Sequence, residues 1–117
     1  MEFAGNQIWR IREGEYSGVD VHIHKVLSHD VIAQSFHISV PSEKVSHMPF
    51  SEDALTQSNL EFVRLEQNLG TDWEEGFGIW HEAFRQSDAG VFSVSVTDAI
   101  NLVCDTRDNG VQREPID

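Results

Sequence analysis

The segment from Val19 to Val40, VDVHIHKVLSHDVIAQSFHISV, alternates apolar and polar residues on both sides of a short polar turn. Alternation of this kind places successive side chains on opposite faces of an extended chain, so each half is predicted to be a strand with one buried face. Two such strands joined by a short turn form an antiparallel hairpin. The segment therefore restricts the chain to folds built around an antiparallel sheet.

The register of this hairpin is predicted from the requirement that apolar side chains stay together, because a slip of one residue would move every side chain to the other face. The apolar pairs in the favoured register are Leu27 with Ile32, Ile23 with Phe36, Val21 with Ile38, and Val19 with Val40. The same register places His22 opposite His37 and His24 opposite Ser35 on the polar face.

The polar face of the hairpin carries a candidate metal site. Its ligands would be Asp20, His22, His24 and His37. Directly opposed side chains have Cβ atoms about 5 Å apart, which allows two imidazoles to share an ion such as zinc. The H-x-H spacing is also common on exposed strands, and the chain has no HExxH or CxxC motif. If helices cover this face instead, the histidines need hydrogen-bond partners such as Ser35 and Ser39. We therefore expect no cofactor unless these residues hold a divalent metal.

Other strands and helices are predicted from local patterns. Gln7–Glu13 alternates as a first strand, and residues 41–51, which contain two prolines, are predicted to be a loop. Ser51 is expected to cap a short helix that ends near Ser58. Residues 60–66 are predicted to be a short strand after a break near Asn59, with a continued helix as the alternative.

The segment TDWEEGFGIWHEAFRQSDAG is predicted to be a helix. Thr71 and Glu74 have the spacing of a capping box, and Gly90 is expected to end the helix. One aromatic stripe recurs at helical spacing and comprises Trp73, Phe77, Trp80 and Phe84. We expect this stripe to pack in the core against the apolar side of the sheet, and not to form a ligand cage. Gly76 and Gly78 weaken a helix, which indicates a close backbone approach.

The last third of the chain is predicted to add a short strand and a final helix. The strand covers Val91–Val94, and either Ser95 or Thr97 caps the helix. The helix is expected to end before Asp108, and Cys104 is expected to be a buried structural thiol on its apolar side.

The segment Gly78–Val103, GIWHEAFRQSDAGVFSVSVTDAINLV, resembles small acidic bacterial α+β proteins of uncharacterised function, some of which are encoded on mobile gene cassettes of integrons. The likeness covers about a quarter of the chain. It lies in a Trp-bearing helix, an Ala-Gly-Val-Phe turn and a Ser/Thr-capped helix. It implies a helix–strand–helix unit packed on a meander, and it carries no catalytic residue with it.

The composition fits one globular domain, with 39% hydrophobic and 24% charged residues. We assign residues 1–110 to this domain and residues 111–117 to a polar tail. A single cysteine favours a reducing compartment, and neither a signal peptide nor an apolar span of about 18 residues is apparent, so a cytoplasmic location is expected.

The net charge of −12 argues against nucleic acid or an anionic membrane as a partner. Fourteen acids and four bases lie in residues 51–117, a net of −10, against a net of −2 for residues 1–50. This acidity is either a solubilising surface or the footprint of a basic protein partner. The candidate partner-binding acids are Glu52, Asp53, Asp72, Glu74, Glu75 and Glu82.

The predicted fold is therefore α+β, with an antiparallel meander of three to four strands packed against two to three helices. The sheet is expected to leave one face open for a ligand or a second subunit, and this face would carry Trp9, His22, His24 and Val26. The sequence favours a small non-enzymatic binding protein, with an immunity-like role towards a basic protein as its concrete form. A small-molecule or metal-dependent enzyme on the histidine face is the alternative, and a homodimer is a third interpretation.

Overall fold

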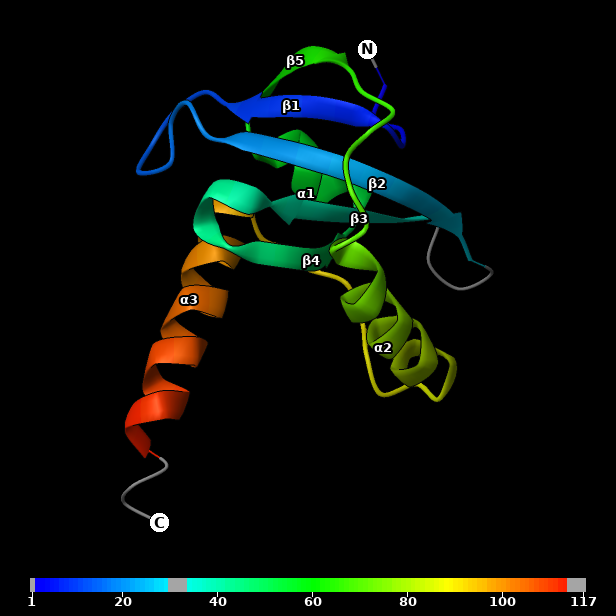
Figure 1. The fold of residues 1–117 in the computed structure, drawn as a ribbon, viewed down its shortest axis with the longest axis vertical. Coiled ribbons are helices and arrows are strands. Elements are labelled where there is room, and N and C mark those ends of the chain that lie inside the picture. The colour runs from blue at the N-terminus through cyan, green and yellow to red at the C-terminus, as the bar shows by residue number, and fades with distance from the viewer. Residues whose placement is uncertain (1, 30–33, 114–117) are drawn as a thin grey trace.

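A computed structural model of the protein describes residues 2–29 and 34–113, with side chains described as far as residue 105. Within these residues the chain forms a five-stranded antiparallel sheet with helices on both faces (Figure 1). The strands are β1 (Gln7–Ile11), β2 (Asp20–Ser28), β3 (Gln34–Val40), β4 (Val45–Phe50) and β5 (Leu60–Leu65). The helices are η1 (Pro41–Glu43), α1 (Glu52–Gln57), α2 (Trp73–Arg85) and α3 (Val96–Arg113). The predicted α+β class is confirmed.

The sheet has the strand order β4-β3-β2-β1-β5. The first four strands form a meander, in which each strand pairs with the next along the chain. The fifth strand follows α1 and pairs with β1 at the opposite edge of the sheet. As a result, the N-terminal strand lies inside the sheet and β4 and β5 form its edges.

One face of the sheet carries the apolar core, and α1 and the start of α3 cover it. The buried core residues contributed by the strands are Trp9, Ile11, Val21, Ile23, Phe36, Ile38, Val40, Val45, Met48 and Phe50. The helices add Ala54, Leu55, Val96, Ala99 and Ile100, each of which is fully buried. We call this side of the sheet the core face.

The predicted hairpin of β2 and β3 is present, but the register predicted for it is wrong. Ile23 lies opposite Ile38, not Phe36, and Phe36 lies opposite Val26. The strands close at Ser28 and Gln34, so the connecting segment is longer than predicted, and the predicted partner Ile32 lies outside the described residues. A bulge at His24 shifts the pairing between Ile23 and Lys25.

The bulge also changes the face on which individual side chains lie. Ile23, Phe36 and Ile38 still share the core face, as predicted. Val26, which was predicted to lie on the opposite face, packs against the core as well. Trp9 lies opposite Val21 and is buried in the same core. The prediction that Trp9 and Val26 share an open face with His22 and His24 is therefore wrong.

The predicted loop over residues 41–51 contains a short 3-10 helix and strand β4. Lys44 ends the 3-10 helix in the left-handed conformation, with a φ of 58°, and so turns the chain back onto β3. Pro49 is tolerated because β4 is an edge strand. A register shift in β4 spaces its buried residues as Val45, Met48 and Phe50, which breaks the alternation that would have revealed a strand.

The short helix and strand that follow are as predicted. Ser51 caps α1 by accepting a hydrogen bond from the backbone N–H of Ala54 at 3.1 Å. Asn59 has a φ of 52°, a left-handed conformation that separates α1 from β5. The expected break near Asn59 and the strand after it are therefore confirmed.

The last two helices differ from prediction mainly at their ends. Asp72 occupies the N-cap of α2 without a side-chain cap, so the predicted capping box from Thr71 does not form. The helix ends at Arg85, before the expected Gly90. Phe92 makes a single bridge to Phe50 where a strand was expected. Ser95 does cap α3, by accepting from the N–H of Asp98 at 3.2 Å.

Helix α3 continues to Arg113, past the predicted end before Asp108. The glycine at position 110 costs a helix only about 1 kcal/mol, which the rest of the helix can offset. In Figure 1 this helix extends past the edge strand β4 and away from the sheet, in the same general direction as the end of α2.

Candidate functional site

The second face of the sheet carries the histidines, and α2 packs on it. The aromatic stripe of α2 contacts imidazoles: Trp73 stacks on His24 with ring centroids 5.1 Å apart, and Trp80 meets His37 at 4.6 Å. We call this side the histidine face. The expectation that the stripe would cover the apolar side of the sheet is therefore wrong, and the histidine face is partly covered instead of open.

Hydrogen bonds to serine satisfy the covered histidines, as the alternative interpretation of the hairpin predicted. The Nε2 atom of His24 is 2.7 Å from the hydroxyl of Ser39, and that of His37 is 2.7 Å from the hydroxyl of Ser35. The bulge at His24 brings its ring to Ser39, whereas the predicted register paired it with Ser35.

Three histidines and one serine form one continuous chain of hydrogen bonds: His29, Ser35, His37 and His47. His29 Nε2 lies 2.7 Å from Ser35 Oγ, which lies 2.7 Å from His37 Nε2, and His37 Nδ1 lies 2.9 Å from His47 Nε2. Ser35 and His37 have 0% exposed surface, whereas His29 and His47 are half-buried. Ser35 has one proton, so it donates to one imidazole and accepts from the other. Every bond in the chain can therefore form while all three rings are neutral.

Burial lowers the pKa of three histidines on this face. For His37 the pKa falls to about 3, mainly through burial and also through the nearby His47 and His29. Burial also lowers the pKa of His47 to about 4. It lowers the pKa of His24 to about 4, with a further contribution from His22. Each ring is therefore neutral near pH 7 and can accept one hydrogen bond and donate another.

Three of the four residues predicted as metal ligands bind separate partners, and the fourth, His22, lies apart from them. Asp20 forms an ion pair with Arg10, with 2.8 Å between Oδ1 and Nε. His37 turns towards His47, and His24 binds Ser39. The rings of His22 and His24 are 6.3 Å apart. In the described part of the chain, no three His, Cys, Asp or Glu side chains gather at a spacing that could hold a metal ion.

His22 lies opposite Ser39 in the strand register, not opposite His37. Its Nδ1 atom is buried and has no hydrogen-bond partner among the described residues. Burial lowers the pKa of His22, while the charge of Asp20 opposes that change.

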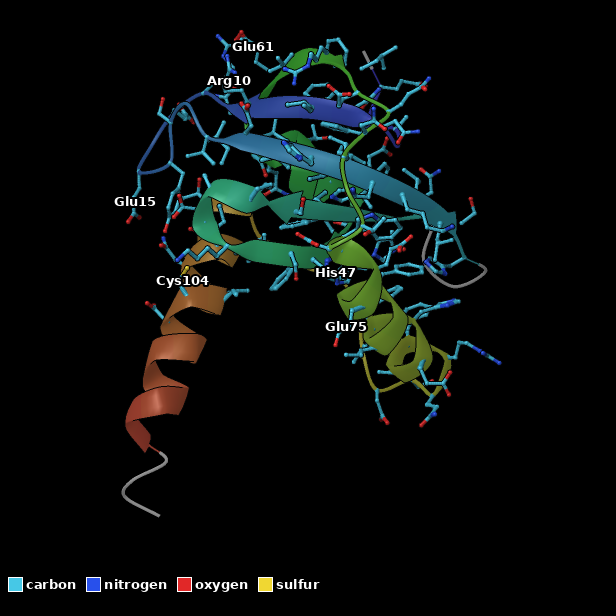
Figure 2. The ribbon with its side chains drawn as sticks, viewed as in Figure 1. Arg10, Glu15, His47, Glu61, Glu75 and Cys104 are labelled. Atoms are coloured by element: carbon cyan, nitrogen blue, oxygen red, sulfur yellow. The ribbon has the colours of Figure 1, made fainter. Side chains whose placement is uncertain are left out.

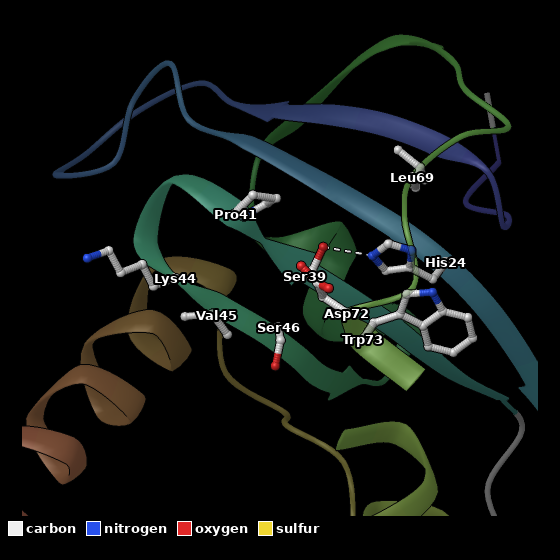
Figure 3. Close-up of a pocket in the computed structure, with 9 residues that line it drawn as sticks. All are labelled: His24, Ser39, Pro41, Lys44, Val45, Ser46, Leu69, Asp72 and Trp73. Atoms are coloured by element: carbon white, nitrogen blue, oxygen red, sulfur yellow. Dashed lines mark hydrogen bonds between the residues drawn. The ribbon is translucent and has the colours of Figure 1, made fainter. Parts of the chain in front are cut away.

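A pocket of about 330 Å³ lies beside His24, where η1, β4 and the start of α2 meet (Figure 3). Its polar lining residues include Ser39, Ser46 and Asp72. Leu69 and Trp73 supply apolar surface. The linker from β5 to α2 crosses the histidine face to reach this point (Figure 1), which explains how Leu69 and Asp72 arrive beside β3.

The Ser39–His24 pair has the distance of a nucleophile and its base, but not their setting. A catalytic serine needs an imidazole that a third group orients, and access to a substrate. Among the described residues no carboxylate contributes to the pKa of His24, and Ser39 is only 6% exposed. This pair therefore holds the ring in place and provides a polar wall for the pocket.

A second surface lies on the outward side of α2. Ile79 is 68% exposed there, on a floor completed by Gly78 and Ala83. Four acids surround this floor: Glu74, Glu75, Glu82 and Asp88. We call these residues the Ile79 surface. His47 lies on the other side of the same helix, at its junction with β4, and Glu75 extends from the helix (Figure 2).

The candidate partner-binding acids do not share one surface. Glu74, Glu75 and Glu82 belong to the Ile79 surface, and Asp72 lies in the pocket beside His24. Glu52 and Asp53 begin α1, which packs on the core face. Cys104 packs against the core from the apolar side of α3, as predicted, but it is only half-buried where a buried thiol was expected.

The sequence patterns did not single out Ile79, Asp88 or the histidine chain. Ile79 could have been found, because it falls outside the aromatic stripe on the helix and so must point away from it. His47 could not have been found, because it lies in a segment predicted to be a loop.

Comparison of the chain with protein-family models, with curated proteins and with solved structures found no match. Among the described residues, no helix combines the length and the apolar character needed to cross a membrane.

Proposed function

We propose that this protein is a small binding protein whose partner is a basic protein, held at the Ile79 surface of α2. An inhibitory, immunity-like role is the concrete form of this proposal, in which the acidic helix covers a basic site on the partner. A location in the cytoplasm belongs to the same proposal and is supported by the single cysteine.

The observation that carries the proposal is an exposed apolar side chain surrounded by acids. Ile79 exposes 68% of its surface on an otherwise well-formed helix. Protein interfaces commonly have an apolar centre within a polar rim, and a few central side chains supply most of the binding energy. The acidic rim would speed the approach of a basic partner and disfavour acidic ones.

The partner is more consistent with a basic protein than with a second copy of this chain. A symmetric dimer through this surface would bring the four acids of one copy against the surface that carries the same four acids in the other copy. Only Glu82 of the four acids forms an ion pair within the described chain, with Arg85 at 3.6 Å. Self-association here would therefore bring uncompensated like charges together.

The test is affinity capture from a lysate of the source organism, followed by measurement of binding to the purified captured protein. Ile79→Ala removes the apolar centre and keeps a good helix former. We expect it to weaken binding about tenfold. The triple variant E74Q/E75Q/E82Q should weaken binding further and should reduce its dependence on salt.

The matched control removes three charges elsewhere, in the variant E52Q/D53N/E61Q. We expect this variant to bind within about twofold of the wild type. Equal losses from both triple variants would indicate attraction to net charge alone. A captured protein that is not basic, or that binds Ile79→Ala as well as the wild type, would contradict the proposal.

A further inference from the structure

The pocket beside His24 contains a carboxylate that has no counter-charge in the described chain. Asp72 lines this pocket and forms no ion pair there, and its side chain makes no cap to α2. The only lysine or arginine among the lining residues is Lys44. In Figure 3 the Lys44 side chain extends away from Ser39 and Asp72.

Ring surface forms the wall next to this carboxylate. The rings of Trp73 and His24 are stacked, with only 14° between their planes. The indole N–H of Trp73 donates to the carbonyl of Gly70 at 3.2 Å, so the indole offers the pocket ring surface and no donor. The aromatic stripe already receives one cation nearby, because Lys25 Nζ lies 5.7 Å from the centroid of Phe77.

The hydroxyl groups of the pocket can accept hydrogen bonds. Ser39 can donate its proton to Nε2 of the neutral His24 ring, which leaves its lone pairs available to a ligand. Ser46 also lines the pocket, but in Figure 3 its hydroxyl points away from Ser39 and Asp72. A carboxylate next to an accepting hydroxyl matches a group that has several N–H donors and a positive charge.

We infer that this pocket binds a small organic ammonium ion. Asp72 supplies the counter-charge, and Ser39 accepts an N–H bond. Trp73 and Leu69 contact the apolar part of the ligand. The volume of about 330 Å³ is at the small end for ligand sites and suits an amine with a short apolar group. This inference is independent of the proposed protein partner, which would use the opposite side of α2.

The test uses three probes with the same phenyl group and different charge: phenethylammonium, 2-phenylethanol and phenylacetate. Binding is followed at about 0.15 M salt, where long-range attraction to the net negative charge is screened. The observable is the NMR signal of the Trp73 indole N–H. We expect phenethylammonium to bind about tenfold more tightly than the alcohol, and phenylacetate to bind least.

The variant Asp72→Asn keeps the size of the side chain and is a good residue at a helix N-cap. We expect it to weaken phenethylammonium binding about tenfold and to leave alcohol binding unchanged. Glu75→Gln is the matched control, because it removes one charge three residues later on the Ile79 surface. It should change the affinity by less than about twofold.

Three results would overturn the inference. The Trp73 signal could fail to move with any probe, the alcohol could bind as tightly as the ammonium, or both variants could lose the same affinity. The last result would mean that the probe senses only net charge. None of these outcomes affects the proposed protein partner, whose test depends on Ile79.

Discussion

The two glycines of α2 lie two residues apart but have different surroundings. A Cβ atom added to Gly76 would lie 2.9 Å from the Cβ of His47, a distance that real Cβ atoms almost never show. A Cβ atom added to Gly78 would meet nothing within 4 Å. Gly76 therefore allows the helix to approach β4 closely, whereas Gly78 has no such role.

We predict opposite effects of alanine at these two positions. Gly78→Ala should stabilise the protein by about 0.5–1 kcal/mol, because alanine is the better helix former. Gly76→Ala should destabilise it by about 1–3 kcal/mol, because the helix or the His47 backbone must move. Urea unfolding of both variants measures the difference. Equal changes in the free energy of unfolding would show that α2 does not lie this close to β4.

The sequence identified these residues only in part. Both glycines indicate a close backbone approach, and only one of them makes it. The difference depends on the position of His47 on β4, a strand whose alternation is interrupted by a bulge. In the same way, serine partners for the histidines followed from the pattern, but the pairing of His24 with Ser39 depends on a bulge that no local signal predicts.

At the scale of secondary structure, one buried hydroxyl connects two helices. Ser58 donates to the carbonyl of Ala54 at 2.7 Å, at the end of α1. It also accepts from the backbone N–H of Val96 at 2.9 Å, at the start of α3. Ser58 is 7% exposed, so water cannot easily replace it.

We predict that Ser58→Ala destabilises the protein by about 1–3 kcal/mol, because it leaves the Val96 N–H buried without a partner. Thr56→Ala is the control. It removes an exposed hydroxyl that bonds to the Glu52 carbonyl, and it should change stability by less than about 0.5 kcal/mol. Thermal unfolding followed by circular dichroism distinguishes the two. A loss for Thr56→Ala as large as that for Ser58→Ala would contradict the role assigned to this bond.

Elements with strong local signals were predicted well. Ser51 and Ser95 are side-chain caps at helix starts, and Asn59 takes the left-handed conformation that separates helix from strand. Elements without a clear local signal were not predicted. Strand β4 contains Pro49 and a bulge, which together remove the alternation by which strands are recognised.

At the scale of the whole molecule, neutral histidines hold the sheet and α2 together. The stripe of α2 rests on His24, His37 and His47, whose pKa values are about 4, about 3 and about 4. In an unfolded chain, histidine titrates near 6.5. Below pH 6.5 the unfolded chain therefore binds more protons than the folded protein.

We predict that stability is full above about pH 6.5 and is lost as the pH falls towards 4. Near pH 5.5, unfolding should take up about two to three protons, as measured from the pH dependence of the unfolding free energy. The variant His24→Gln should reduce this number by about one. A free energy of unfolding that is constant between pH 7 and pH 5.5 would show that these rings are already charged in the folded protein.

The side of the sheet on which α2 packs is a property of the whole molecule, and the sequence did not reveal it. An aromatic stripe is expected to pack on an aliphatic face, because burial of apolar area is favourable. Here α1 and α3 already cover that face. The stripe instead packs on imidazoles, whose rings also offer flat surfaces and are neutral when buried. Local patterns cannot show which helix occupies which face.

The position of β1 inside the sheet has a consequence for synthesis on the ribosome. This strand leaves the ribosome before the other four strands, yet one of its two neighbours, β5, is synthesised only after α1. Pairing of Trp9 with Phe62 closes a far longer loop than the hairpins do, and such closure is slow. Until then, one edge of β1 offers bare N–H and C=O groups to any nascent neighbour. Mispairing between growing chains is therefore most favoured in the interval before Leu60–Leu65 docks.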